Sequence, residues 1–154
     1  MTEQTGRCLC GDIRFRLTGA PYEVDYCHCH SCRKHTGAPV SVFADCKAGI
    51  VEFTRGAPTL YQSSPGVRRG FCARCGSTLT YETDSLPGEV HVHIGALDRP
   101  EDFPPHGKSS FPEERLPWLR IAGVAGGSRS GTWGARAPNV TPRPRIRSTN
   151  RRRA

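Results

Sequence analysis

The stretch CHCHSCRK, residues 27–34, places three thiols and two imidazoles within six residues. Cysteine and histidine are the side chains that zinc prefers, and ligands two or three residues apart can reach one ion. Two further pairs, Cys8-x-Cys10 and Cys72-x-x-Cys75, lie on either side of this stretch. The fold therefore depends on what these clustered thiols bind.

The spacing of the cysteines favours metal ligation over a disulfide framework. Cys8 and Cys10 are two residues apart, as are Cys27 and Cys29, which is too close for an unstrained disulfide within either pair. The N-terminal segment has no apolar run of the kind that a secretory signal carries. We therefore expect a cytoplasmic protein without a membrane span, whose thiols stay reduced.

The positive charge of the chain is unevenly distributed. The net charge of the 154 residues is +8, but residues 1–122 contain as many acidic as basic residues. Residues 123–154 contain eight arginines and no acid, among many Gly, Pro and Ser. We expect one domain at 1–122 and a disordered basic tail at 123–154. Nucleic-acid binding would then be weak and confined to the tail.

Alternation of apolar and polar residues predicts an all-β domain. In DIRFRLTG, residues 12–19, Ile13, Phe15 and Leu17 share one face. One helical turn is expected at residues 31–35. Short strands bounded by Gly or Pro are expected at 39–46, 49–54, 59–64, 67–72, 77–83 and 89–97. This pattern predicts small, mostly antiparallel sheets.

The clustered cysteines divide into four plus three. One tetrahedral structural zinc site would be completed by Cys8, Cys10, Cys72 and Cys75, joining the two ends of the domain. A second zinc ion on Cys27, Cys29 and Cys32 would keep one position open, as catalytic zinc does. Alternatively, one of His28, His30, His35 or Cys46 fills that position. Both ions would then be structural.

Four residues near these clusters have simpler explanations. His28 alternates with the ligands in an extended segment and should point away from the metal. Cys46 follows a predicted strand and is expected to be a small buried hydrophobic residue. His91 and His93 alternate along one strand and share one face. We expect that face to be solvated rather than to form a third metal site.

Five segments together resemble the glutathione-dependent formaldehyde-activating enzyme (GFA) family: GRCLCGDIRFRLTG, CHCHSCRKHTGA, FCARCGSTLTY, VHIGALD and RLPWL. The resemblance extends over residues 6–121. It implies a β-tent arrangement of sheets, a structural zinc on the first four cysteines named above, and a second zinc on the other three that is linked to glutathione. The implied reaction is condensation of formaldehyde with glutathione to S-(hydroxymethyl)glutathione, which is carbon–sulfur lyase chemistry. After RLPWL the chain departs from the family's usual acidic close.

Basic residues beside the clusters are candidates for binding the carboxylates of glutathione. Arg33 and Lys34 are the first choice, and Arg68 and Arg69 are weaker candidates. No residue in the sequence is an evident general base. Holding the thiol and the aldehyde together would itself favour the reaction.

Two other functions stay open at this point. One is a non-catalytic zinc module that binds a protein partner, which predicts a closed second site, or that instead carries glutathione. Nucleic-acid binding through the tail predicts steep salt dependence and its complete loss on truncation after Ile121.

Overall fold

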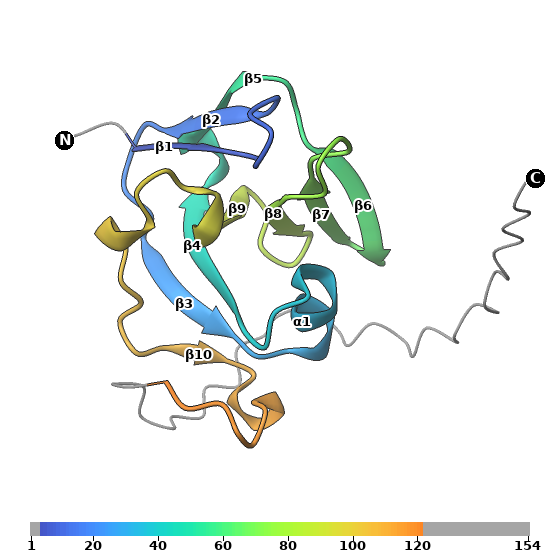
Figure 1. The fold of residues 1–154 in the computed structure, drawn as a ribbon, viewed down its shortest axis with the longest axis vertical. Helices are drawn as coiled ribbons and strands as arrows, with labels where there is room; N and C mark the ends of the chain where they lie inside the picture. The colour runs from blue at the N-terminus through green and yellow to red at the C-terminus, as the bar shows by residue number, and fades with distance from the viewer. Residues whose placement is uncertain (1–3, 122–154) are drawn as a thin grey trace, which may run out of the picture.

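The structure, a computed structural model, describes residues 4–121, whose strands form two sheets (Figure 1). The smaller sheet has the order β1-β2-β5 and is antiparallel. Its strands are β1 (Gln4–Arg7), β2 (Arg14–Leu17) and β5 (Val51–Arg55). The alternation that predicted β2 places Phe15 and Leu17 in the core.

The larger sheet has the order β10-β3-β4-β9-β8-β7-β6. Its neighbours are antiparallel, except that the two-residue strand β10 runs parallel to β3. The strands are β3 (Glu23–Cys27), β4 (Ser41–Lys47), β6 (Thr59–Ser64), β7 (Val67–Phe71), β8 (Thr78–Thr83), β9 (Glu89–His93) and β10 (Ser109–Ser110). The predicted all-β, mostly antiparallel fold is confirmed.

The helix α1 (His30–Thr36) follows β3 directly and confirms the predicted turn at 31–35. The thiol of Cys29 caps its start by accepting the N–H of Cys32, with an N···S distance of 3.3 Å. Gly37 ends the helix at φ 67°, a left-handed conformation that glycine adopts without steric cost. Four short 3-10 helices complete the described part: Ala48–Ile50, Ile94–Ala96, Pro100–Asp102 and Pro112–Glu114.

Each segment predicted as a strand contains one, although the second half of 89–97 forms a 3-10 helix instead. The sequence did not predict β1, β3 and β10. In β3 the alternation is hidden because both faces are buried: Val24 packs in the apolar core, while Asp25 and Cys27 are buried on the opposite face. The segment therefore shows no clear alternation of apolar and polar residues.

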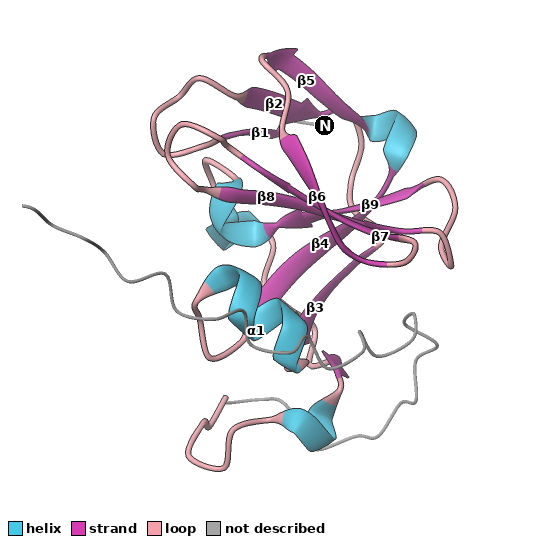
Figure 2. Ribbon diagram, turned by 90° about the vertical axis from the view of Figure 1, so that its right-hand side faces the viewer, coloured by secondary structure: helices cyan, strands magenta, loops and turns pink. Residues whose placement is uncertain are grey.

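The larger sheet separates an apolar face from a polar one. Val24, Ala44 and Val92 are paired neighbours on β3, β4 and β9, and they pack in one cluster with Phe15 of the smaller sheet. Cys46 is fully buried in the same cluster, which confirms its prediction as a small core residue. Figure 2 shows the smaller sheet and α1 on opposite sides of the larger sheet, so α1 covers the polar face.

In the described part of the chain, no helix is long and apolar enough to cross a membrane. The predicted tail at 123–154, and with it the boundary after residue 122, lie outside the described residues.

Candidate functional site

The four-cysteine cluster consists of Cys8, Cys10, Cys72 and Cys75, whose sulfur atoms all lie within 4.8 Å of one another. The Sγ atoms of Cys8 and Cys10 are 3.5 Å apart, and those of Cys10 and Cys72 are 3.8 Å apart. Zn–S bonds of about 2.3 Å in a tetrahedron require S···S separations of about 3.8 Å. The thiols therefore fit a zinc ion.

Two turns bring these thiols together. One follows β1, and the other connects β7 to β8, so the cluster links the smaller sheet to the larger one. Gly76 has φ 75°, as expected for the residue after the second pair, and its N–H donates to the carbonyl of Cys72 at 2.8 Å. The N–H of Ile13 donates to the Sγ of Cys8 at 3.3 Å. Such N–H donors favour the thiolate form.

The three-cysteine cluster consists of Cys27, Cys29 and Cys32, whose sulfur atoms also lie within 4.8 Å of one another. Cys27 ends β3, Cys29 caps α1, and Cys32 lies in the first turn of the helix. Among the described residues, no histidine nitrogen, carboxylate oxygen or fourth thiol joins this cluster within the same distance. His28 is excluded from it, as the alternation predicted.

Arg69 contacts the three-cysteine cluster from the larger sheet. Its side chain is buried, with the whole residue 4% exposed, and Nη1 donates to the Sγ of Cys32 at 3.4 Å. Nε donates to the hydroxyl of Ser63 at 2.9 Å, and the guanidinium lies 5.1 Å from the ring centroid of Tyr81. Hydrogen bonds from Cys27 and Cys29, followed by the charge of Arg69, lower the pKa of Cys32 although burial raises it.

A row of buried polar side chains leads from β4 across the sheet to Arg69. Asp45, His91, Tyr81 and Arg69 are successive cross-strand partners on β4, β9, β8 and β7. Asp45 accepts a short hydrogen bond from Nδ1 of His91, whose ring meets that of Tyr81 edge-on at 5.6 Å. With the contact from Arg69 to Cys32, this row ends at the three-cysteine cluster.

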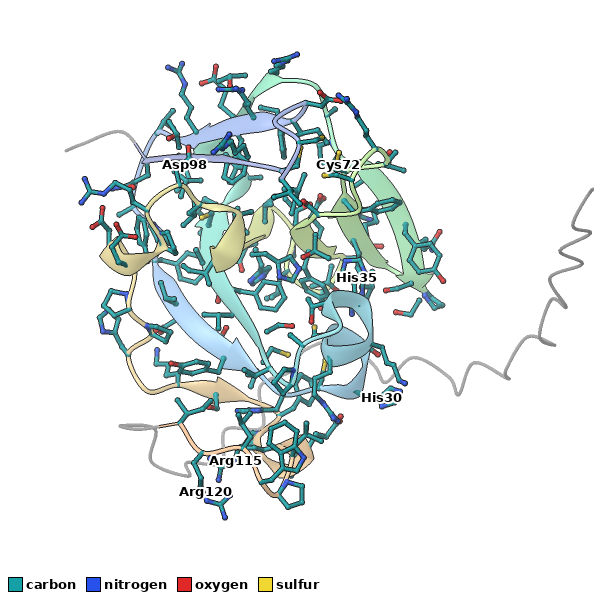
Figure 3. All side chains as sticks on the ribbon, in the orientation of Figure 1. His30, His35, Cys72, Asp98, Arg115 and Arg120 are labelled. Carbon is teal, nitrogen blue, oxygen red and sulfur yellow. The ribbon has the colours of Figure 1, made fainter. Side chains whose placement is uncertain are left out.

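The expectation of a solvated face for His91 and His93 is wrong. The two residues share one face, but they are 0% and 6% exposed. Both rings contact that of Phe43, at centroid distances of 6.3 and 4.5 Å. Burial, then the charges of His35 and Arg69, lower the pKa of His93 to about 3. Figure 3 places His35 between α1 and the larger sheet, where its ring centroid lies 6.1 Å from that of His93. Alternation revealed the shared face but not which side the helix would cover.

Arg33 and Lys34 lie on α1, beside a hollow of about 520 Å³ that Leu116 and Trp118 also line. Nε of Arg33 donates to the carbonyl of His28 at 2.9 Å. None of the three cysteines lines this hollow. The structure thus places both cations on the helix that carries Cys32, and their role as substrate contacts stays a prediction.

Arg68 and Arg69, the weaker candidates, differ from each other in the structure. Arg68 forms ion pairs with Glu82 at 3.6 Å and Asp84 at 2.7 Å, on the face of the sheet opposite to Arg69. Arg69 points inward to Cys32. The sequence named both arginines for the carboxylates of a substrate and missed the contact between Arg69 and a cysteine. Strand alternation from Val67, a buried residue, could have indicated it.

A second hollow of about 640 Å³ lies between the four-cysteine cluster and α1. Cys8 and Ser77 line it at one end, and Thr36, Ser41 and His93 line it at the other. Its walls combine apolar side chains with a few polar groups, as small-molecule sites do.

A family model described as glutathione-dependent formaldehyde-activating enzyme (GFA) matches residues 3–112. The chain belongs to the GFA family. A protein of Halomonas elongata, provisionally named as a glutathione-dependent formaldehyde-activating enzyme, is 31% identical over 126 residues. The match covers 75% of this chain and 79% of that protein. An uncharacterised lyase of Schizosaccharomyces pombe is 31% identical over 81 residues, covering 53% of this chain and 58% of that protein.

A solved structure from Rhodobacter sphaeroides resembles this GFA chain in fold. The TM-score is 0.51 at 26% sequence identity, and the match covers 61% of this chain and 87% of the other. The two ligand sets that the resemblance to the GFA family implied are the same two sets of thiols that the structure brings together.

Proposed function

We propose that this chain is a carbon–sulfur lyase of the GFA type, which condenses formaldehyde with glutathione to S-(hydroxymethyl)glutathione or acts on a related glutathione adduct. The main support is the three-cysteine cluster, whose thiols converge with no fourth ligand among the described residues. Membership of the GFA family and the name of the relative from Halomonas elongata point in the same direction.

Two zinc ions per chain form part of this proposal. The four-cysteine cluster would hold the structural ion, and Cys27, Cys29 and Cys32 would hold the ion at the catalytic site. Both fit zinc because thiolates are characteristic zinc ligands. Separations of 3.5 and 3.8 Å in the four-cysteine cluster suit a tetrahedron, and the sulfur atoms of the three-cysteine cluster lie within 4.8 Å of one another. Bound to three thiolates, zinc supplies an open Lewis-acidic position that favours the ionised form of a thiol.

The proposed reaction needs little acid–base chemistry from the protein. The sulfur of glutathione forms a bond to the carbon of formaldehyde, the π bond of the carbonyl breaks, and the thiol proton ends on the oxygen. Among the described residues, no carboxylate oxygen or histidine nitrogen joins the three sulfur atoms within 4.8 Å. We therefore assign proton transfer to water, and to the protein the task of holding and orienting the two reactants.

Glutathione carries two carboxylates, and we propose that Arg33 and Lys34 bind them. Both residues line the hollow of about 520 Å³ on the outer side of α1. The indole of Trp118, which is largely exposed, lies at the same hollow and offers an apolar surface for the peptide. The sulfur of the ligand would then have to reach Cys29, the least buried of the three cysteines.

Native mass spectrometry of the zinc-loaded chain, titrated with glutathione, tests this function. We expect two zinc ions and one glutathione per chain, with loss of glutathione binding in Cys29→Ser. Exchange spectroscopy between formaldehyde and its adduct then measures turnover against the uncatalysed rate. The proposal would be contradicted if the chain, with two zinc ions bound, did not bind glutathione and did not accelerate the exchange.

A glutathione carrier is the second candidate function. It is favoured because, among the described residues, no carboxylate oxygen or histidine nitrogen joins the three sulfur atoms within 4.8 Å as a candidate acid or base. A carrier would bind glutathione and lose this binding in Cys29→Ser, yet leave the rate of adduct exchange unchanged. The exchange measurement therefore separates a carrier from a lyase.

A further inference from the structure

Arg69 is a buried cation whose guanidinium contacts a cysteine sulfur in the three-cysteine cluster. We propose that Arg69 is a positioning residue that balances the charge of this cluster, so that the open position prefers an anionic ligand such as a thiolate to a neutral one. This inference rests on the proposed function, because it assumes a divalent ion on the three thiols. It adds a residue that determines which class of ligand can enter.

The charges at the cluster add up simply. Three thiolates and one divalent ion carry a net charge of −1, and Arg69 brings the sum to zero. A fourth ligand that is an anion then leaves −1 in a buried site, whereas without Arg69 it would leave −2. Because uncompensated charge in a buried site is costly, Arg69 selectively favours the anion.

The charge of Arg69 is not neutralised by a carboxylate of the described residues. Among residues 4–121, no carboxylate lies within ion-pair distance of its guanidinium, and its partners are Ser63, Cys32 and the ring of Tyr81. Asp45 lies in the same row, but His91 and Tyr81 stand between the two residues. The positive charge is therefore directed at the sulfur of Cys32.

The anchoring of Arg69 supports a positioning role. The hydroxyl of Ser63 holds Nε at 2.9 Å, which directs the other side of the planar guanidinium towards Cys32. Gly70, the next residue, packs its Cα against the side chain of Thr80, so that the backbone beside Arg69 is closely fitted. A guanidinium fixed in this way offers a fork of donors that a lysine does not have.

Within residues 4–121, the four-cysteine cluster has no comparable buried cation beside it. Its neighbour Arg74 is exposed and donates to both carboxylate oxygens of Asp12 at 2.8 and 2.7 Å. Cys10 is exposed, so water can screen the charge of that cluster. The buried arginine is thus specific to the cluster that keeps an open position.

Cobalt-loaded protein allows the ligand preference to be measured without any turnover. Co²⁺ bound to thiolates absorbs visible light, and the spectrum changes when a fourth ligand binds. Azide serves as the anionic probe and imidazole, at pH 8, as the neutral probe; both bind metals through nitrogen. The full chain is titrated as wild type, Arg69→Gln, Arg69→Lys and the matched control Arg68→Gln, whose arginine is the exposed neighbour in β7. Retention of metal against a chelator is recorded in parallel.

We expect Arg69→Gln to weaken azide binding by roughly 10-fold or more, in the range found for groups that contact metal ligands, while imidazole binding changes little. Arg69→Lys should keep the preference for azide, and Arg68→Gln should resemble wild type. Equal weakening of azide and imidazole in Arg69→Gln would overturn the proposal, because a purely structural role affects both probes. If Arg69→Gln does not fold, Arg69→Lys tests the proposal instead. This variant keeps the positive charge, so loss of its preference for azide would also overturn the proposal.

The outcome is separable from that of the proposed function. A wild-type protein that binds azide in preference to imidazole, but does not bind glutathione, would refute the glutathione reaction. Selective loss of azide binding in Arg69→Gln would still support the role of Arg69. A wild-type spectrum that responds to neither probe would show a closed site and would overturn both.

Discussion

The sulfur atoms of Cys10 and Cys72 lie 3.8 Å apart, although 62 positions separate the two residues in the chain. Cys10 belongs to the turn between β1 and β2, and Cys72 to the turn between β7 and β8. Their approach joins the two sheets, together with a hydrogen bond from the N–H of Leu9 to the hydroxyl of Ser77 at 2.9 Å. Figure 3 marks Cys72 at this junction beside the smaller sheet.

Removal of a ligand from the four-cysteine cluster should therefore destabilise the whole domain. We expect Cys10→Ser to lower the free energy of unfolding by about 3 kcal/mol or more, because metal binding contributes directly to folding. Chemical denaturation measures this loss, and zinc content should fall by one ion per chain.

The matched control is Cys46→Ala, a buried cysteine outside both clusters. It should keep both ions and lose only about 1 kcal/mol for its small cavity. Equal losses in the two variants would contradict a metal at this junction.

The pH dependence of stability should include a contribution from His93. Its pKa is about 3 in the folded protein, whereas a histidine in an unfolded chain titrates near pH 6.5. Below about pH 6.5 the unfolded chain binds a proton that the folded chain does not, so the free energy of unfolding falls as the pH falls towards 3. Urea denaturation at pH 7.5 and 5.0 measures this slope.

The variant His93→Gln should remove that contribution. We expect its loss of stability between pH 7.5 and 5.0 to be smaller than that of wild type by roughly 2 kcal/mol. Zinc release by acid affects both proteins, so the difference between them reports on His93. An identical slope in the two proteins would show that His93 is not held neutral by burial.

Gly70 should not tolerate a side chain unless Thr80 is shortened. A Cβ atom at position 70 would lie 2.1 Å from the hydroxyl oxygen of Thr80 and 3.1 Å from Cβ of Pro58. We expect Gly70→Ala to cost about 2 kcal/mol or more, because the overlap forces the strands apart. The hydroxyl of Thr80 is buried and has no hydrogen-bond partner among the described residues, so Thr80→Ala alone should cost little.

A double-mutant cycle checks this contact. The double variant Gly70→Ala/Thr80→Ala should recover most of the loss of Gly70→Ala, giving a coupling energy of about 1 kcal/mol or more. Additive effects in denaturation experiments would mean that β7 and β8 can separate at this point without cost.

Glutathione binding should depend on the charge of Lys34. Its ammonium lines the hollow on α1 at which we place the carboxylates of the ligand. Lys34→Gln should weaken binding by roughly 3- to 10-fold, with a smaller dependence on salt, as expected for one partly exposed ion pair. The control Lys47→Gln removes a lysine that pairs with Glu89, away from this hollow. Calorimetric titration of both variants measures the effect, and equal affinities would exclude the hollow as the carboxylate site.

The sequence predicted the local parts of this molecule well. Alternation identified most strands, and cysteine spacing identified two sets of thiols that the structure brings together. It could not predict which face of a strand is covered, because this depends on segments far away in the chain. For this reason His91 and His93 were assigned to a solvated face, and Arg69 was considered only as a contact for substrate. Asp25, buried beneath Ser110 of β10, escaped notice for the same reason.

The pairing of β10 with β3 has a consequence for how the protein is made. Ser110 lies beside Cys27 in this parallel pair. Strand β3, which positions the first thiol of the three-cysteine cluster, therefore has an unpaired edge until residue 110 has been synthesised. Since translation adds about 5–20 residues per second, this edge is exposed on the ribosome for several seconds. Three neighbouring thiols are reactive during that interval. Early capture of a metal ion by the nascent chain would protect them from oxidation before the edge is closed.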